Sequence, residues 1–251
     1  MTLVLAIRCP LLPLKFRAGL LKFSYDLWLG PVEPRPYHPD YLPFHWRNWW
    51  AFGGGTLADL GCHYVDLPYW ALGLTAPDSV ETDGPDPDPE SPPVWLIARY
   101  HYPQYRQGGL NLTWHHGGKR PQRFDELKLE HEQAAKWKSG ILFVGEEGDL
   151  LADYSRHLLF PEAKFKDFKH PEPRIEKSVG HHKEWIAACK HGTPTTCNFD
   201  YSGGLTEAVL LGNVAYRVGK KLQWNSAQLK ATNSPEADRF IQHHYRVGWT
   251  L

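Results

Sequence analysis

The hydrophobic pattern divides the chain into one early helix, a run of strands and a set of late helices. Between residues 56 and 72, apolar side chains recur three and four positions apart, which is the spacing of an amphipathic helix. Residues 94–102 instead alternate between an apolar set and a more polar set. This period of two predicts a strand with one drier face.

Similar strand patterns start at residues 110, 141 and 149, and the segment Gly145–Gly148 predicts a hairpin turn between the last two. Helical patterns follow near 180–192 and 201–221, and a last helix is expected from Pro235 onward. One helix, then strands, then helices is typical of an α+β fold. We therefore expect an open, mainly antiparallel sheet with helices packed on one face.

The chain is expected to comprise an atypical leader, residues 1–24, and a single α+β substrate-type domain, residues 25–251. The leader is apolar, but it has no basic segment before its first apolar run, and charged and proline residues interrupt that run well short of the ~18 residues that a membrane span needs. It is interpreted as neither signal peptide nor anchor. The proline-rich stretch 83–93 is expected to be an exposed loop between strands.

Composition narrows the classes of partner. Lys+Arg and Asp+Glu each total 28, so no overall field attracts nucleic acid or an anionic membrane. The four cysteines form no C-x-x-C pair, which suits reduced thiols in the cytoplasm. The 11 Trp, 12 Tyr and 11 Phe residues could pack in a core or stack on sugar rings, and core packing is the commoner fate.

Gly53, Gly55 and Ala58 fit the G-x-G-x-x-A pattern of dinucleotide-binding loops. That mechanism needs a buried strand before the glycines and a second strand ending in an acid about 20 residues later. The flanking sequence provides neither. We expect no cofactor binding by this loop, and interpret the glycines as a tight turn into the helix.

Asp59 and His63 are four residues apart on this expected helix, so the carboxylate can orient the imidazole. Such a pair suits the oxidation of an alcohol, because the hydroxyl proton must be removed as hydride leaves carbon. Asp66, further along, could extend the same face toward the hydroxyls of a polyol. A solvated surface pair is about equally consistent with the spacing.

The segment GGGTLADLGCHYVDLPYW resembles the G-G-x-x-x-D-x-G-x-H-x-x-D-x-x-x-W signature of the Gfo/Idh/MocA family of sugar and polyol oxidoreductases. Residues 25–249 are similar to the carboxy-terminal half of bacterial members. The resemblance implies a two-domain enzyme in which a Rossmann domain binds NAD(P), and a second domain carries substrate and subunit contacts. Only the second domain is expected here, so no cofactor is expected to bind this chain alone.

The same resemblance implies that Asp59 and His63 are the catalytic pair. In the family they act with a lysine of the nucleotide-binding domain, in an E-K-P context that this sequence lacks. It also implies a homo-oligomer that pairs through the sheet face.

Further candidate substrate contacts are Trp46, Trp49, Trp50, His181 and Tyr201, with the tryptophans placed to stack on a sugar ring or close a pocket mouth. Histidine pairs such as His181–His182 have no recognised metal-site spacing, so no metal is expected.

Three functions stay open. The first is a sugar or polyol oxidoreductase domain that depends on another unit for NAD(P). The second is a cofactor-independent carbohydrate hydrolase or lyase that uses Asp59 and His63. The third is a non-catalytic module for sugar binding or oligomerisation.

Overall fold

A nine-stranded sheet organises the computed structural model, which describes residues 2–7, 24–127, 129 and 137–249. The strand order is β7-β6-β5-β1-β4-β3-β2-β8-β9. The bounds are β1 Thr2–Ile7, β2 Ser79–Asp83, β3 Leu96–Tyr102, β4 Leu110–His116, β5 Ser139–Val144, β6 Asp149–Ala152, β7 His157–Phe160, β8 Leu222–Asn225 and β9 Lys230–Ala231. β1 pairs with β4 in parallel, and the other described pairs are antiparallel. The predicted mainly antiparallel sheet is confirmed.

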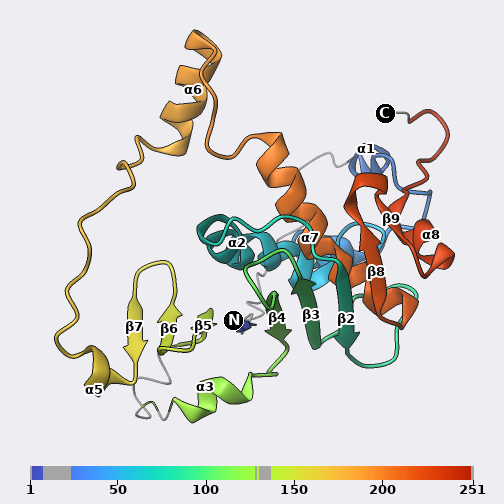
Figure 1. Cartoon of the computed structure of the whole chain (residues 1–251). Helices are drawn as coiled ribbons and strands as arrows, with labels where there is room; N and C mark the ends of the chain where they lie inside the picture. Colours follow the sequence, from blue (N-terminus) through green and yellow to red (C-terminus); the bar gives the residue numbers. More distant parts are fainter. Residues whose placement is uncertain (1, 8–23, 128, 130–136, 250–251) are drawn as a thin grey trace.

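Two long helices, α2 (Gly55–Ala71) and α7 (Phe199–Val218), pack side by side against one face of this sheet (Figure 1). The shorter helical elements are α1 Tyr25–Leu29, η1 Pro39–Tyr41, η2 His45–Asn48, α3 Gln122–Glu126, α5 Glu162–Phe165, α6 His181–His191, η3 Ser226–Gln228, η4 Pro235–Ala237 and α8 Asp238–Ile241. The α+β fold with helices layered on one face is thus as predicted.

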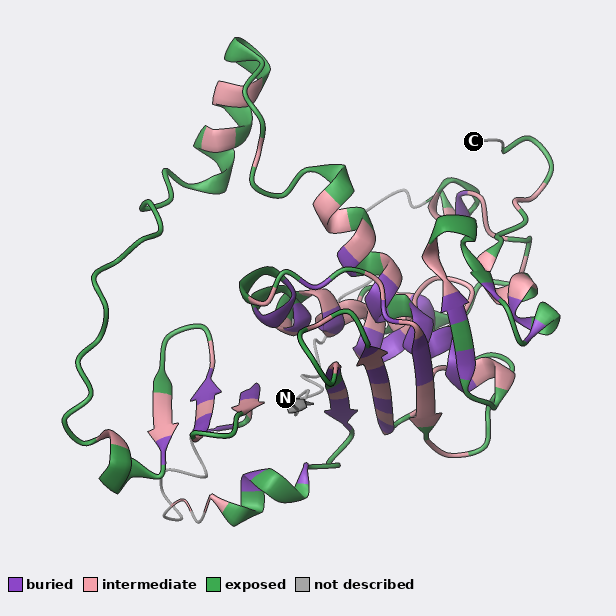
Figure 2. Cartoon of the chain, viewed as in Figure 1, coloured by how far each residue is buried: buried purple, intermediate pink, exposed green. Residues whose placement is uncertain are grey.

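The main core lies between α2, α7 and the sheet, where buried residues concentrate (Figure 2). Along β3, Leu96, Ala98, Tyr100 and Tyr102 are buried, and the three residues between them are partly exposed. The period of two in the sequence therefore marks the face that the helices cover. The Tyr100 hydroxyl donates a hydrogen bond to the carbonyl of Val209 in α7, at 2.9 Å, which ties the strand to the helix.

The structure differs from the sequence expectations at both ends of the chain. Residues 2–7, assigned to the leader, form β1 between β4 and β5. The apolar run is far too short for a membrane span but long enough for a strand. The helix expected from Pro235 is only the short η4 followed by α8, because Gln242 has an extended backbone that ends it. Among the described residues, no helix combines the length and the apolar character needed to cross a membrane.

Glycines allow α2 and α7 to approach the sheet and each other closely. A Cβ at Gly61 in α2 would lie 2.4 Å from Cγ1 of Val209, and one at Gly212 in α7 would lie 2.3 Å from the Tyr100 hydroxyl. Both distances are too short for nonbonded atoms. The layer spacing therefore depends on the absence of side chains at these two positions.

The Gly61→Ala substitution is expected to destabilise the protein by about 1–3 kcal/mol, because the added methyl group must displace the buried Val209 side chain. Gly203→Ala is the matched control, since Gly203 lies in the same pair of helices and its Cβ would meet nothing within 4 Å. It should stabilise by up to about 1 kcal/mol through helix propensity. Urea denaturation measures both, and equal effects of the two substitutions would contradict the packing argument.

Candidate functional site

A cleft of about 720 Å³ opens at the start of α2. Its lining residues come from five segments of the chain. These are η2 with the residue before it, the first turns of α2, the loop from 91 to 94, the glycines after β4 and the residue before β5. They include Phe44, Arg47, Asn48, Thr56, Asp59, Pro92, Pro93, Val94 and Lys138. Of the predicted site residues, Asp59 is the one that lines this cleft.

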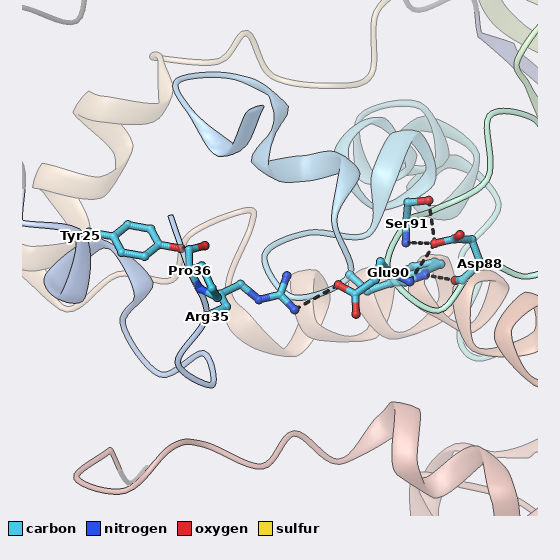
Figure 3. Close-up of polar contacts among 7 residues, drawn as sticks. Tyr25, Arg35, Pro36, Asp88, Glu90 and Ser91 are labelled. Atoms are coloured by element: carbon cyan, nitrogen blue, oxygen red, sulfur yellow. Dashed lines mark hydrogen bonds and ion pairs between the residues drawn. The ribbon is translucent and has the colours of Figure 1, made fainter. Parts of the chain in front are cut away.

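One wall of the cleft is the loop that connects β2 to β3, and Asp88 fixes its conformation (Figure 3). Asp88 Oδ1 accepts hydrogen bonds from the backbone N–H groups of Glu90 and Ser91, at 2.8 and 2.7 Å, and these bonds lower the pKa of the carboxyl group. Arg35 forms an ion pair with Glu90 at 3.1 Å, which joins this loop to the segment between α1 and η1. The wall is therefore an ordered surface.

The triple glycine brings the backbone close to both walls. Gly55 has a φ of +64°, and a Cβ there would lie 2.5 Å from Cβ of Pro92. A Cβ at Gly53 would lie 2.7 Å from Cα of Arg47. The Gly54 carbonyl accepts a hydrogen bond from Nδ2 of Asn213 in α7, at 2.9 Å. The predicted tight turn into the helix is confirmed, and the protein's own atoms occupy the space around it.

Asp59 is paired with an arginine that the sequence analysis did not single out. Its Oδ2 lies 3.6 Å from Nε of Arg47, and both side chains are partly buried. The Arg47 guanidinium also stacks over the Phe44 ring, 4.0 Å from its centroid, which holds it in place. The carboxylate therefore sits beside a fixed positive charge inside the cleft.

His63 lies one turn further along α2, with an exposed side chain. Its carbonyl accepts a hydrogen bond from the Tyr154 hydroxyl at 3.2 Å. In the part of the chain that the structure describes, no hydrogen bond joins Asp59 to His63. The two residues share a helix face, as the spacing requires, but the carboxylate contacts Arg47.

Asp66 and Tyr201 are brought together away from this cleft. The Tyr201 hydroxyl donates to Oδ1 of Asp66 at 2.6 Å, and its ring meets Tyr69 edge-on. Burial and the neighbouring carboxylate raise the pKa of Tyr201. This hydrogen bond joins α2 to the start of α7. The two candidate substrate residues therefore contact each other and do not line the cleft.

The tryptophan candidates are largely engaged in packing. Trp50 donates from Nε1 to the Asp88 carbonyl at 3.0 Å and packs on the Tyr216 ring, and Trp49 packs edge-on against Tyr41. Trp46 lies in η2, partly exposed, with the Arg47 guanidinium 5.1 Å from its ring centroid.

His181 lies on α6, which projects away from the sheet (Figure 1). The structure therefore does not bring it to the cleft with Asp59. Among the described residues, no three His, Cys, Asp or Glu side chains gather into a group that could hold a metal ion.

Sequence reasoning missed two cations of the cleft, Arg47 and Lys138. Arg47 stands in a short 3-10 turn and Lys138 directly precedes β5, so neither belongs to a periodic pattern or to a motif. Only the folded chain brings them into the same cleft as Asp59. An excess of basic residues could not have revealed them, because the chain as a whole is neutral.

Two buried histidines, His115 and His116, lie at the end of β4, and His116 contacts the wall of the cleft. Trp114 donates from Nε1 to Nδ1 of His116 at 2.8 Å, and His116 Nε2 reaches the carbonyl of Pro93, which lines the cleft, at 3.4 Å. Burial lowers the pKa of both His115 and His116 to about 4. Both imidazoles are therefore neutral in the folded protein near pH 7.

These pKa values predict a loss of stability in mild acid. The unfolded chain, with histidine pKa values near ~6.5, binds more protons than the folded chain as the pH falls from about 6.5 toward 4. The free energy of unfolding should fall by roughly 1–2 kcal/mol per buried histidine between pH 7 and 5. Urea denaturation across this range measures the slope.

Removing one buried histidine should flatten that slope. His116→Gln is expected to reduce the pH dependence, and His182→Gln, on the exposed surface of α6, should leave it unchanged. A slope that is the same in wild type and His116→Gln would rule out the buried neutral imidazole as its source.

One family model matches part of the chain. Residues 16–112 match the family model described as the C-terminal alpha/beta domain of an oxidoreductase family, GFO_IDH_MocA_C2. The match begins inside the segment that the sequence analysis set apart as a leader. It confirms the Gfo/Idh/MocA resemblance for this part of the chain. A comparison with curated proteins found no match.

Two solved structures are similar to the chain at low identity. An oxidoreductase from Thermotoga maritima is 13% identical, with a TM-score of 0.45 over 88% of this chain and 53% of its own. GenD2 from gentamicin A biosynthesis, solved in complex with NAD, is 13% identical, with a TM-score of 0.44 over 90% of this chain and 55% of its own. The chain thus spans little more than half the length of these proteins.

Proposed function

We propose that this chain is the substrate-binding part of an oxidoreductase that acts on a sugar or polyol hydroxyl, because residues 16–112 match the model of the C-terminal alpha/beta domain of an oxidoreductase family. The single observation that carries the proposal is the position of Asp59 in the cleft. A carboxylate that is partly buried beside Arg47 is an acceptor held in a fixed place for a substrate hydroxyl.

The lining of the cleft suits a carbohydrate in both polar and apolar respects. Asp59 accepts hydrogen bonds, and Asn48 and Thr56 can donate them, which matches the two-way bonding of hydroxyl groups. Phe44 and Val94 provide apolar surface for the C–H face of a ring. A volume of about 720 Å³ is within the usual range for small-molecule sites.

In this proposal Asp59 orients the reacting hydroxyl, and His63, exposed one turn further along α2, accepts its proton. NAD(P) would supply the acceptor for the hydride. The glycine turn of this chain does not fit a dinucleotide, because Pro92, Asn213 and the Arg47 backbone fill the space around it. We therefore propose that a unit outside the described residues binds the nucleotide.

A non-catalytic sugar-binding module is the second candidate, and one observation favours it. Asp59 contacts Arg47, and no hydrogen bond connects it with His63 in the described part of the chain. A carboxylate held by arginine can recognise a hydroxyl without moving a proton. The hydrolase or lyase alternative has no comparable observation in its favour.

The proposed substrate role predicts that sugar or polyol binding depends on Asp59. In calorimetric titrations of a polyol and sugar panel, Asp59→Asn should weaken binding by roughly tenfold, because a charged acceptor is lost (about 1.4 kcal/mol). Asp167→Asn, at an exposed position outside the cleft, is the matched control and should bind as wild type does. Equal affinity of wild type and Asp59→Asn would contradict the proposal.

The role of His63 separates the candidates. When the nucleotide-binding unit and NAD(P) are supplied, His63→Gln should lower turnover with little change in sugar affinity, because the imidazole acts on the proton. Turnover of glycosides without nucleotide, lost in His63→Gln, would favour the hydrolase. Micromolar binding of NAD(H) or NADP(H) by this chain alone would contradict our interpretation of the glycine turn.

We also propose that the chain forms a homo-oligomer through the sheet face opposite α2 and α7. That face exposes polar side chains, with an Arg99–Asp83 pair and a His101–Asp78 pair at 2.8 Å. Light scattering should give at least twice the 28.8 kDa mass of one chain. A strict monomer at high concentration would exclude the proposed assembly.

A further inference from the structure

We propose that the cleft beside Asp59 recognises an oxyanion on its ligand, a carboxylate or phosphate group, and that Lys138 is the side chain that contacts it. This inference rests on the function proposed above and narrows its substrate class. The expected ligand is an anionic carbohydrate, such as a sugar acid or a sugar phosphate, in place of a neutral sugar.

The charges that line the cleft do not balance. Among the described lining residues, Arg47 and Lys138 are cationic and Asp59 is anionic. Arg47 and Asp59 face each other at 3.6 Å and largely offset each other. Lys138 belongs to none of the ion pairs between described residues, and its side chain is exposed to the cleft. One positive charge therefore remains for a ligand, in a chain whose overall charge is zero.

The backbone beside Asp59 adds to this positive potential. Gly55 and Thr56 line the cleft from the first turn of α2, a helix of 17 residues. The first backbone N–H groups of a helix have no partner within the helix and carry its positive dipole end. Gly54, at the N-cap, has no side chain to accept from them. The helix end and Lys138 therefore both contribute positive electrostatic potential to the cleft.

The wall formed by Pro92, Pro93 and Val94 carries no cation. Pro92 and Pro93 have no backbone N–H group, and Val94 has an apolar side chain. An oxyanion is therefore drawn toward Lys138 and the α2 end of the cleft. The uncharged part of the sugar is left against the apolar wall and within reach of Asp59. The cleft can hold both parts of one small molecule, since its volume is about 720 Å³.

The experiment compares matched ligands on the purified full chain. Glucose, glucuronate and glucose 6-phosphate are titrated by calorimetry into wild type, Lys138→Met, Lys138→Arg and Lys183→Met. Wild type should bind one or both anionic ligands roughly 3–10-fold more tightly than glucose, as expected for a partly exposed charge pair. The preferred anion distinguishes the carboxylate from the phosphate.

The variants locate the charge that is responsible. Lys138→Met should abolish the preference for the anionic ligands over glucose, and Lys138→Arg should restore most of it. Lys183→Met removes the same charge from α6, which projects away from the cleft, and should bind as wild type does. Raising the salt concentration should reduce the preference in wild type.

The failures of the two proposals are distinguishable. If wild type binds glucose and both anions equally, or if Lys138→Met keeps the preference, the oxyanion site is refuted and the sugar site remains. If none of the three ligands binds and the wider polyol panel is also negative, the proposed function itself fails, and the inference fails with it.

Discussion

The close contact of α2 with α7 and the sheet is the constraint on which the rest of the molecule depends. Val209 and the Tyr100 hydroxyl occupy the positions where side chains of Gly61 and Gly212 would otherwise lie. This contact fixes the axis of α2, and with it the direction of the face that carries Asp59. The same helix begins at Gly55, held against Pro92, and Asn213 of α7 binds the carbonyl of Gly54. The core and the cleft are therefore parts of one packing arrangement.

Residues that follow a strict period were predictable from the sequence. The alternation in β3 reports on one buried face, because burial on a regular element repeats with the element. The spacing of residues 56–72 predicted the helix but not its buried face, since Leu67 is exposed and Gly61 and Val65 are buried. The Gly145–Gly148 turn was also predicted from the sequence. In the structure, a backbone hydrogen bond from Gly145 N–H to the Gly148 carbonyl closes it at 3.1 Å. These features are local, so one stretch of sequence contains all the information.

The cleft could be predicted only in part, because its residues converge from separate segments. The motif pointed to Asp59, but nothing local indicates that Arg47 lies against it or that Lys138 lines the same cleft. β1 was missed for a related reason. A strand of six residues with five apolar ones is ambiguous alone, and the partners that make it a central strand, β4 and β5, lie more than 100 residues later.

In the proposed reaction, the different exposures of Asp59 and His63 suit two different roles. A residue that only orients a hydroxyl gains from being fixed and partly buried, since its hydrogen bond is stronger where water is scarce. Asp59, held beside Arg47, meets this condition. A residue that accepts a proton in every cycle must also release it, and an exposed imidazole can pass it directly to water. His63 is in that position, one turn away on the same helix face. In the proposed reaction the two side chains need no direct bond to each other, because Asp59 would hold the oxygen of the substrate hydroxyl and His63 would take its proton.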